Sequence, residues 1–223
     1  LDKSHELDYN HTFLTTWTSL LLADQLNIKN LIFSSSSAVF GEKDKKIKES
    51  TGPLLPISYY GAMKMASEGI ISAAKSYHLD KYTIFRFPNV VGSDSTHGVI
   101  FDFINKLKAD SKVLKVLGNG EQMKPYLHID DLVDAMLYLE KQEDKNRIFN
   151  ISPFDQGIKV KDIAEMCANK FGNNTEIIYE DNESGWIGDV PYYSYDTEKQ
   201  EYFGFQPKYS SKEAVSKVLE TYK

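Results

Sequence analysis

Two apolar runs separated by a long helical pattern constrain the fold of this chain more than any other feature. Leu31-Ile32-Phe33 is a short, fully apolar run of the kind found in buried parallel strands. Residues 82–87 are rich in aromatic and β-branched side chains and predict a second strand. Between them, Ser58 fits the N-cap of a helix over residues 59–77. A strand, helix, strand unit of this kind predicts a parallel sheet with a right-handed crossover.

The remaining patterns predict further elements on both sides of this unit. We expect helices over 99–108, 159–171 and 210–222, and strands over 113–117, 126–129 and 148–151. A helix ending near Asn27 comes first, with a buried stripe made of Phe13, Trp17, Leu20, Leu21 and Ala23. Asp130 and Asp131 precede an apolar helical face, and we interpret them as favourable charges at a helix N-terminus.

Composition excludes several classes of function. A length of 223 residues with 41% hydrophobic content is enough for a sizeable core. The net charge of -6 argues against binding nucleic acid or an anionic membrane. Cys167 is the single cysteine, which excludes a disulfide framework and a cysteine zinc cluster, and no metal site is expected. The uncharged stretch from Tyr9 to Ala23 is too short to span a membrane, and with no targeting signal the cytoplasm is the default location.

Tyr60 and Lys64 are the first candidate catalytic residues. A spacing of four residues places both side chains on one face of a helix, with an ammonium beside a phenol. The spacing alone is weak, because Tyr77 with Lys81 and Tyr195 with Lys199 repeat it. Only the first pair follows a serine-rich strand end, and that context selects it.

The order of five segments resembles the extended short-chain dehydrogenase/reductases, in particular the nucleotide-sugar epimerases and dehydratases. The segments span nearly the whole chain: residues 34–41, Tyr60 to Lys64, 86–92 (Arg-Phe-Pro-Asn-Val-Val-Gly), 118–131 and 188–191 (Gly-Asp-Val-Pro). The resemblance implies an α/β fold, namely part of a Rossmann-like doubly wound parallel sheet with a smaller mixed α/β substrate domain. On this basis residues 1–91, joined by 147–152, belong to the NAD-binding domain, and residues 92–223 mainly form the substrate domain.

The resemblance gives Tyr60 the role of base. Oxidising a sugar alcohol requires a group that takes the hydroxyl proton while hydride leaves the same carbon. Lys64 is expected to lower the pKa of Tyr60 and to contact the nicotinamide ribose, and Ser36 matches the catalytic serine. The other expected contacts to the cofactor, NAD, come from Ser34, Ser35, Phe87 and Thr12, the last of which stands where the family has an asparagine.

Ser37 and Ala38 narrow the choice among the reactions that this family catalyses. Dehydratases of this family carry an Asp and a Glu at these two positions, and decarboxylases carry a Glu at the second. Neither residue present here can act as an acid or base at neutral pH. The resemblance therefore favours 4-epimerisation of the UDP-glucose/UDP-galactose type, with a reductase or a 2-epimerase as near alternatives.

The substrate side departs from the family pattern. Asn89 matches an asparagine that contacts the nucleotide diphosphate, while Lys124 and Trp186 each stand where an arginine is usual. Lysine supplies charge without the two-pronged donor of arginine. Tyr193 lies where the family sets pocket size, and its bulk favours plain hexoses over N-acetylated ones. The resemblance adds three further substrate contacts: Val99, Leu117 and Asp189.

No Gly-x-x-Gly-x-x-Gly turn, on which the family binds the pyrophosphate, occurs in the sequence. We therefore expect the chain to be part of a longer protein, and its sequence leaves NAD and NADP, the sugar and the base undistinguished. A catalytically silent relative that serves as a binding or scaffolding module is the alternative. Relatives commonly dimerise through the helices expected here over residues 9–26 and 59–77, so a homodimer is expected.

Overall fold

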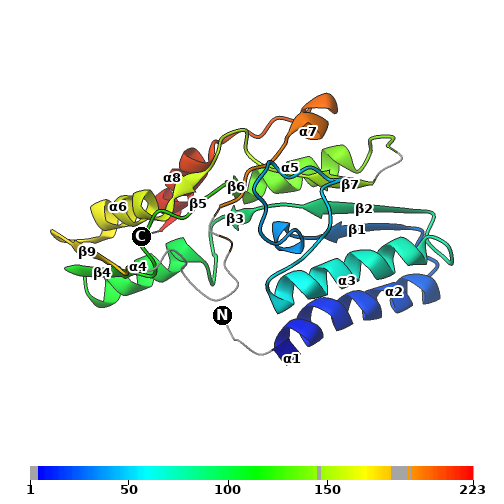
Figure 1. Cartoon of the computed structure of the whole chain (residues 1–223), viewed down its shortest axis with the longest axis horizontal. Coiled ribbons are helices and arrows are strands. Elements are labelled where there is room, and N and C mark those ends of the chain that lie inside the picture. The colour runs from blue at the N-terminus through cyan, green and yellow to red at the C-terminus, as the bar shows by residue number, and fades with distance from the viewer. Residues whose placement is uncertain (1–4, 145–146, 182–189, 191, 223) are drawn as a thin grey trace. The chain divides into compact units, whose positions relative to one another are not determined.

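The computed structural model describes residues 5–144, 147–181, 190 and 192–222 and divides the chain into two compact units (Figure 1). The first unit comprises Leu1–Phe87, Met136–Ile151 and Asp196–Phe205, and the second comprises Pro88–Ala135, Ser152–Tyr195 and Gln206–Lys223. The first segment thus ends at Phe87 instead of residue 91. Residues 196–205, which were expected in the second unit, lie in the first.

A three-stranded parallel sheet forms the centre of the first unit. Its strands are β1 (Asn30–Ser34), β2 (Lys81–Arg86) and β7 (Ile148–Asn150), in the order β1-β2-β7. Its helices are α1 (His5–Asp8), a π-helical segment (Tyr9–Leu14), α2 (Thr15–Gln25), a 3-10 turn (Ser37–Val39), α3 (Tyr59–Ala74) and α7 (Glu198–Tyr202). In Figure 1, α2 and α3 run side by side below β1 and β2. The strand, helix, strand unit is confirmed as parallel.

The buried face predicted for the first helix is confirmed for two of its residues and wrong for two others. Leu20 and Ala23 are buried, but Trp17 is 46% exposed and Leu21 is 49% exposed. Thr12 and Thr16 take the buried positions instead, where the Thr16 hydroxyl donates to the Thr12 carbonyl at 2.8 Å. Apolar residues occur on every side of this helix, so their pattern could not identify the buried face.

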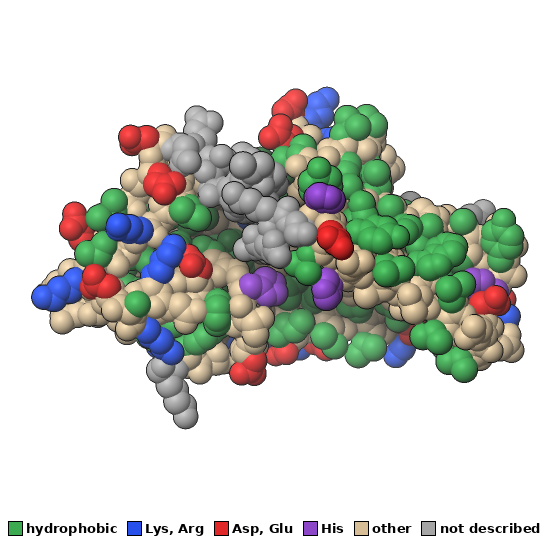
Figure 2. Space-filling model, turned by 90° about the horizontal axis from the view of Figure 1, so that it is seen from below, with side chains coloured by type: hydrophobic (Ala, Val, Ile, Leu, Met, Phe, Trp, Pro, Cys, Tyr) green, Lys and Arg blue, Asp and Glu red, His purple; other side chains and the backbone are tan. Residues whose placement is uncertain are grey.

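β1 is also less buried than a fully apolar run suggests. Leu31 and Phe33 pack against Leu20 and Ile71, whereas Ile32 on the opposite side of the strand is 44% exposed. Successive side chains of a strand point to opposite faces, and the described residues cover one face of β1 better than the other. On the opposite side of this unit, which α2 and α3 cover, Figure 2 shows hydrophobic side chains gathered in the right half of the view.

The second unit is built from short strand pairs and helices. Its strands are β3 (Asn89–Val91), β4 (Val113–Val116), β5 (Met123–Lys124), β6 (Tyr126–His128), β8 (Ile158–Lys159) and β9 (Glu176–Tyr179). Its helices are α4 (Val99–Ala109), α6 (Val160–Phe171) and α8 (Ser211–Thr221), whereas α5 (Ile129–Leu139) contributes residues to both units. The pairs β3-β6 and β4-β9 are parallel, and β5-β8 is antiparallel.

Asp131 lies at a helix N-terminus as expected, and it has a further role there. It lies within the first turn of α5 and is fully buried. Its two carboxylate oxygens accept hydrogen bonds from the backbone N–H groups of Lys208 (3.0 Å) and Tyr209 (3.1 Å). The carboxylate therefore fixes the segment that leads into α8, whose own N-cap is Ser210 in a capping box with Glu213.

Within the described residues, no helix is long and apolar enough to cross a lipid bilayer. The same part of the chain holds no cluster of three or more His, Cys, Asp or Glu side chains that could bind a metal ion. Cys167 is fully buried in the core of the second unit, and burial raises the pKa of its thiol to about 12.

Candidate active site

The serine run after β1 leaves the sheet at the carboxyl ends of the parallel strands. Ser35 still belongs to the ladder, because its N–H donates to the Phe85 carbonyl at 2.7 Å. Ser36 caps the 3-10 turn, and its Oγ accepts from the N–H of Ala38 at 3.2 Å. In open parallel sheets ligands bind at the carboxyl ends of the strands, so this turn lies where a site is expected.

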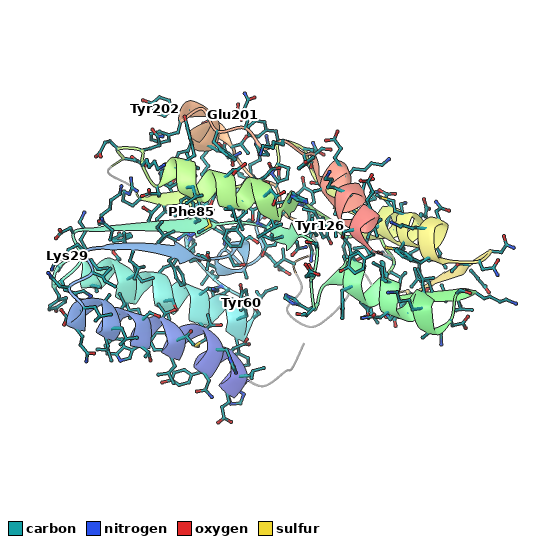
Figure 3. All side chains as sticks on the ribbon, turned by 180° about the vertical axis from the view of Figure 1, so that it is seen from behind. Lys29, Tyr60, Phe85, Tyr126, Glu201 and Tyr202 are labelled. Atoms are coloured by element: carbon teal, nitrogen blue, oxygen red, sulfur yellow. The ribbon has the colours of Figure 1, made fainter. Side chains whose placement is uncertain are left out.

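α3 supplies the other two candidates. Its N-cap Ser58 accepts from the Gly61 N–H at 3.1 Å, which confirms the expected cap and places Tyr60 in the first turn (Figure 3). Gly61 lets α3 approach the serine turn closely, because a Cβ at this position would lie 2.4 Å from the Ala38 carbonyl oxygen.

The structure brings Ser36, Tyr60 and Lys64 together. The Ser36 hydroxyl forms a side-chain hydrogen bond with Tyr60. The Lys64 ammonium donates to the Ser34 carbonyl at 2.8 Å and lies 5.7 Å from the centre of the Tyr60 ring. It also lies 4.9 Å from the centre of the Phe33 ring. An alcohol donor, a phenol and a cation thus converge at one strand end.

The electrostatics of Tyr60 differ from the expectation. Withdrawal of its hydroxyl from water raises the pKa of Tyr60 above the ordinary value of 10, although the residue as a whole is 40% exposed. The hydrogen bond to Ser36 acts in the opposite direction, and the nearby carboxylate of Asp8 raises the pKa further. The expected lowering of this pKa by Lys64 is therefore wrong: the pKa is raised, burial is the largest cause, and the group that lowers it is Ser36.

Lys64 is perturbed by the same environment. Burial lowers the pKa of its ammonium, since the low-dielectric surroundings disfavour the charged form. The carboxylate of Glu68, one turn further along α3, opposes this shift. The two effects leave Lys64 easier to deprotonate than an exposed lysine.

Of the residues expected to contact the cofactor, some bond to other parts of the protein through their main chain and others through their side chain. Ser34 contributes the carbonyl bonded to Lys64, and Phe87 contributes a carbonyl that accepts from the N–H of Ser37 at 3.1 Å. Ser35 is 1% exposed, and its hydroxyl is bonded to Glu68 instead of facing outwards. Thr12 is buried in the π-helical segment that packs on α3.

The donor set at this strand end fits the ribose and nicotinamide part of NAD. Lys64 has three N–H groups, of which one donates to Ser34 within the described chain, and Tyr60 offers a hydroxyl on the same helical face. These two residues would hold ribose hydroxyl groups, which accept and donate hydrogen bonds.

Most expected substrate residues lie in the second unit. Asn89 is exposed at the start of β3, Lys124 is half-buried in β5, and Leu117 is 51% exposed after β4. Val99 begins α4 and packs against the core, and Tyr193 is 8% exposed. Trp186 and Asp189 lie outside the described residues.

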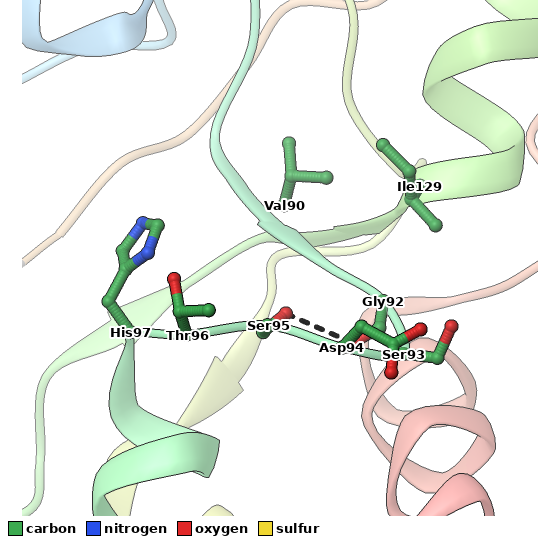
Figure 4. Close-up of a pocket in the computed structure, with 8 residues that line it drawn as sticks. All are labelled: Val90, Gly92, Ser93, Asp94, Ser95, Thr96, His97 and Ile129. Atoms are coloured by element: carbon green, nitrogen blue, oxygen red, sulfur yellow. Dashed lines mark hydrogen bonds between the residues drawn. The ribbon is translucent and has the colours of Figure 1, made fainter.

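A pocket of about 280 Å³ occurs in the same unit, next to the start of α4 (Figure 4). It is lined by the polar segment that follows β3 and by the first residue of α5: Val90, Gly92, Ser93, Asp94, Ser95, Thr96, His97 and Ile129. Gly92 is required there, because a Cβ would lie 2.7 Å from a methyl group of Ile129. None of these residues was singled out from the sequence as a substrate contact.

Two further residues at the serine turn were missed. Glu68 and Arg86 form a buried ion pair, with Arg86 Nη2 2.6 Å from Glu68 Oε2. The signal was present, because Glu68 continues the i, i+4 series of Tyr60 and Lys64, and Arg86 ends β2 beside the serines.

Comparison with known proteins agrees with this arrangement. The sequence matches the NAD dependent epimerase/dehydratase family over residues 3–152, more than half of the chain. The UDP-glucose 4-epimerase of Lactobacillus helveticus is 32% identical over 166 residues, which cover 65% of this chain and 50% of that protein. The chain thus spans half the length of this relative.

Two solved structures extend the match to the fold. A crystal structure of a UDP-galactose 4-epimerase has a TM-score of 0.85 and 32% identity, covering 97% of this chain and 71% of its own. That of a UDP-glucose 4-epimerase with UDP-glucose, from Thermotoga maritima, has a TM-score of 0.80 and 26% identity, covering 97% and 71%. The fold is Rossmann-like α/β with parallel strands, and the family uses NAD. The chain belongs to the NAD-dependent epimerase/dehydratase family of the extended short-chain dehydrogenase/reductases.

Proposed function

We propose that the protein is a nucleotide-sugar 4-epimerase of the UDP-glucose/UDP-galactose type. The observation that carries the proposal is the convergence of Ser36, Tyr60 and Lys64 at one strand end, with a hydrogen bond between the serine and the phenol. A scaffold has no use for this trio. Family membership and the similarity to UDP-sugar epimerases support the same reaction class.

Tyr60 is the proposed base and later the acid. Its phenolate takes the proton of the sugar 4-hydroxyl while hydride leaves C4, so that an alcohol becomes a ketone. NAD, when bound, would accept the hydride and later return it, and the positive charge of its oxidised ring would favour the Tyr60 phenolate. After the keto-sugar presents its other face, hydride returns to C4 and Tyr60 gives the proton back to the oxygen. Ser36 donates to the sugar oxygen and holds it beside the phenol.

Dehydration and decarboxylation are disfavoured by the two residues after Ser36. Ser37 is 7% exposed, and its N–H is bonded to the Phe87 carbonyl. The Ala38 carbonyl packs against Gly61. The dehydratases and decarboxylases of the family carry acidic residues at these positions, and this chain does not. The proposed reaction therefore ends when hydride returns to the same carbon.

The proposed substrate contacts are Asn89 and Lys124 for the diphosphate and Tyr193 for the sugar. Lys124 supplies a point charge in place of the arginine fork, so we expect phosphate binding to depend more on salt concentration than in relatives with arginine. The bulk of the Tyr193 side chain supports a preference for plain hexoses over N-acetylated ones.

Substitution of the base tests the proposal. The purified protein is assayed for bound NAD by absorbance and for interconversion of UDP-glucose and UDP-galactose. Tyr60→Phe is expected to lower kcat by about 10²-fold to 10⁴-fold, because a general base is lost, with NAD still bound. Tyr77→Phe is the matched control, since Tyr77 repeats the spacing to a lysine and is 86% exposed. Full activity of Tyr60→Phe, or no turnover of either sugar despite bound NAD, would refute the proposal.

We also propose that the protein is a homodimer formed through α2 and α3. Leu14, at the end of the π-helical segment, and Trp17 and Leu21 of α2 occur at i, i+3 and i+7 and are between 39% and 49% exposed. Ala66 and Ile70 of α3 are half-buried, which leaves part of their apolar surface for a partner. Exposed apolar stripes of this kind are typical of protein interfaces.

A further inference from the structure

Glu68 and Arg86 form a deeply buried charged pair near the candidate catalytic residues. Glu68 is 6% exposed and Arg86 is 3% exposed. Such charges are tolerated in a protein interior only when paired and hydrogen-bonded, because removal from water is costly.

The geometry of the pair is two-pronged. Arg86 Nε donates to Glu68 Oε1 at 2.9 Å and Arg86 Nη2 donates to Oε2 at 2.6 Å. Arg86 Nη1 donates to the Glu49 carbonyl at 3.2 Å, and the guanidinium carbon lies 4.8 Å from the centre of the Phe40 ring. The arginine is therefore fixed from several sides, and it fixes the carboxylate in turn.

The third partner of the carboxylate is Ser35. Its hydroxyl donates to Glu68 Oε1 at 2.5 Å. Ser35 stands between Ser34, whose carbonyl accepts from Lys64, and Ser36, whose hydroxyl is bonded to Tyr60. Three consecutive serines are thus bonded to three residues of α3 that are spaced by one helical turn.

We propose that Glu68, held by Arg86, is a positioning residue that fixes the Ser34–Ser36 segment at the spacing that Tyr60 and Lys64 need for catalysis. The proposal rests on the proposed epimerase function. Without the bond to Ser35, the segment keeps its backbone ladder but loses the side-chain anchor to α3, so that the Ser34 carbonyl and the Ser36 hydroxyl can shift relative to the helix.

The carboxylate has a second effect through its charge. It raises the pKa of Lys64, against the lowering by burial. The groups that face this ammonium are Glu68 and the Tyr60 phenol on α3 and the Ser34 carbonyl and Phe33 ring on β1, while Asp8 of α1 acts on the phenol. Loss of the charge at Glu68 therefore makes Lys64 easier to deprotonate.

Three variants of the protein with bound NAD test the proposal. We expect Glu68→Gln, Arg86→Lys and Ser35→Ala each to lower kcat by about tenfold to 10²-fold, because small displacements of reacting groups have effects of this size. KM for UDP-glucose should change by less than about threefold, since the proposed substrate contacts lie elsewhere. In Glu68→Gln the alkaline limb of the kcat profile should also move to lower pH, because Lys64 loses its proton earlier.

Arg147→Lys is the matched control. Arg147 is the second of the two arginines and is 7% exposed. It lies directly before β7, at the amino end of the same sheet, and donates to Thr83 Oγ1 at 2.5 Å and to the Glu140 carbonyl at 2.9 Å. Its substitution removes the fork of a buried arginine away from the serines and should leave kcat and its pH profile unchanged.

Crystal structures of the variants keep this test separate from that of the proposed function. If the parent protein turns over no UDP-sugar, the proposed function fails, but the distance from Lys64 Nζ to the Ser34 oxygen still decides the positioning role. Lengthening from 2.8 Å in Glu68→Gln or Ser35→Ala supports the role. An unchanged distance, or an unchanged kcat and pH profile in an active enzyme, overturns it. So does an equal loss of kcat in Arg147→Lys.

Discussion

At the scale of single residues, Tyr60, the proposed base, has a raised pKa, and its neighbours shift that pKa in opposite directions. Burial and the Asp8 carboxylate raise the pKa of Tyr60, whereas the bond to Ser36 lowers it. At neutral pH the phenol of the chain by itself is therefore protonated. The Lys64 ammonium is bonded to the Ser34 carbonyl. A further positive charge is therefore needed to bring the pKa of Tyr60 below its ordinary value.

This balance predicts opposite shifts for two variants without cofactor. Asp8→Asn should lower the pKa of Tyr60, because a negative charge near the phenolate is removed, and Ser36→Ala should raise it, because the phenolate loses a donor. The measurement is an alkaline absorbance titration, with the signal of the same variant carrying Tyr60→Phe subtracted to isolate one of 14 tyrosines. Shifts of the same sign in both variants would contradict this account.

At the scale of the element, α3 carries three side chains that bond to the serine segment: Tyr60, Lys64 and Glu68. The two glycines of this helix, Gly61 and Gly69, lie about two turns apart and have different surroundings. A Cβ at Gly61 would lie 2.4 Å from the Ala38 oxygen and 3.0 Å from Pro56 Cβ, whereas a Cβ at Gly69 would meet nothing within 4 Å. α3 is thus in close backbone contact at Gly61 and has open space beside Gly69.

Alanine at each of these glycines should consequently have opposite effects. Gly61→Ala should destabilise the fold by about 1–3 kcal/mol through overpacking and lower kcat, because α3 is pushed away from Ser36. Gly69→Ala should raise the free energy of unfolding by about 0.5–1 kcal/mol and leave kcat unchanged, because alanine is the better helix former at an open position. Urea unfolding and the epimerase assay measure both. A stable, fully active Gly61→Ala variant would show that the close approach is not needed.

At the scale of the whole molecule, the exposed stripe of α2 makes the oligomeric state testable. Trp17→Glu should convert the proposed dimer into a monomer, because a charge in the centre of an apolar interface is costly to bury. Sedimentation equilibrium of the protein gives the mass. Tyr202→Glu on α7 is the control, since Tyr202 is 83% exposed and outside the proposed interface. A monomeric parent protein would disprove the interface.

Sequence patterns predicted the parallel sheet and the Ser58 cap, because apolar runs and helix-capping residues are local signals. The grouping of Ser36, Tyr60 and Lys64 was expected from the family resemblance, since the spacing of Tyr60 and Lys64 occurs twice more in the chain, and their catalytic role stays a prediction. They missed the burial of Thr12 and Thr16, since a helix with apolar residues all round does not reveal which face is covered. They also missed the pair of Glu68 and Arg86, whose partners are 18 residues apart and meet only when α3 packs on β2. The predicted direction of the pKa shift of Tyr60 was wrong, because the burial that raises this pKa arises only in the folded protein.

The four serines from Ser34 to Ser37 look like a repeat, yet no two of them are interchangeable. Ser34 contributes a carbonyl, Ser35 and Ser36 contribute hydroxyl groups to different partners, and Ser37 contributes an N–H from a buried position. A shift of the chain by one residue would leave serine at three of the four positions, but each serine would then face the bonding partner of its neighbour. We therefore expect the segment to tolerate substitution at Ser34, which contributes only a main-chain carbonyl, better than insertion or deletion of a residue anywhere within it.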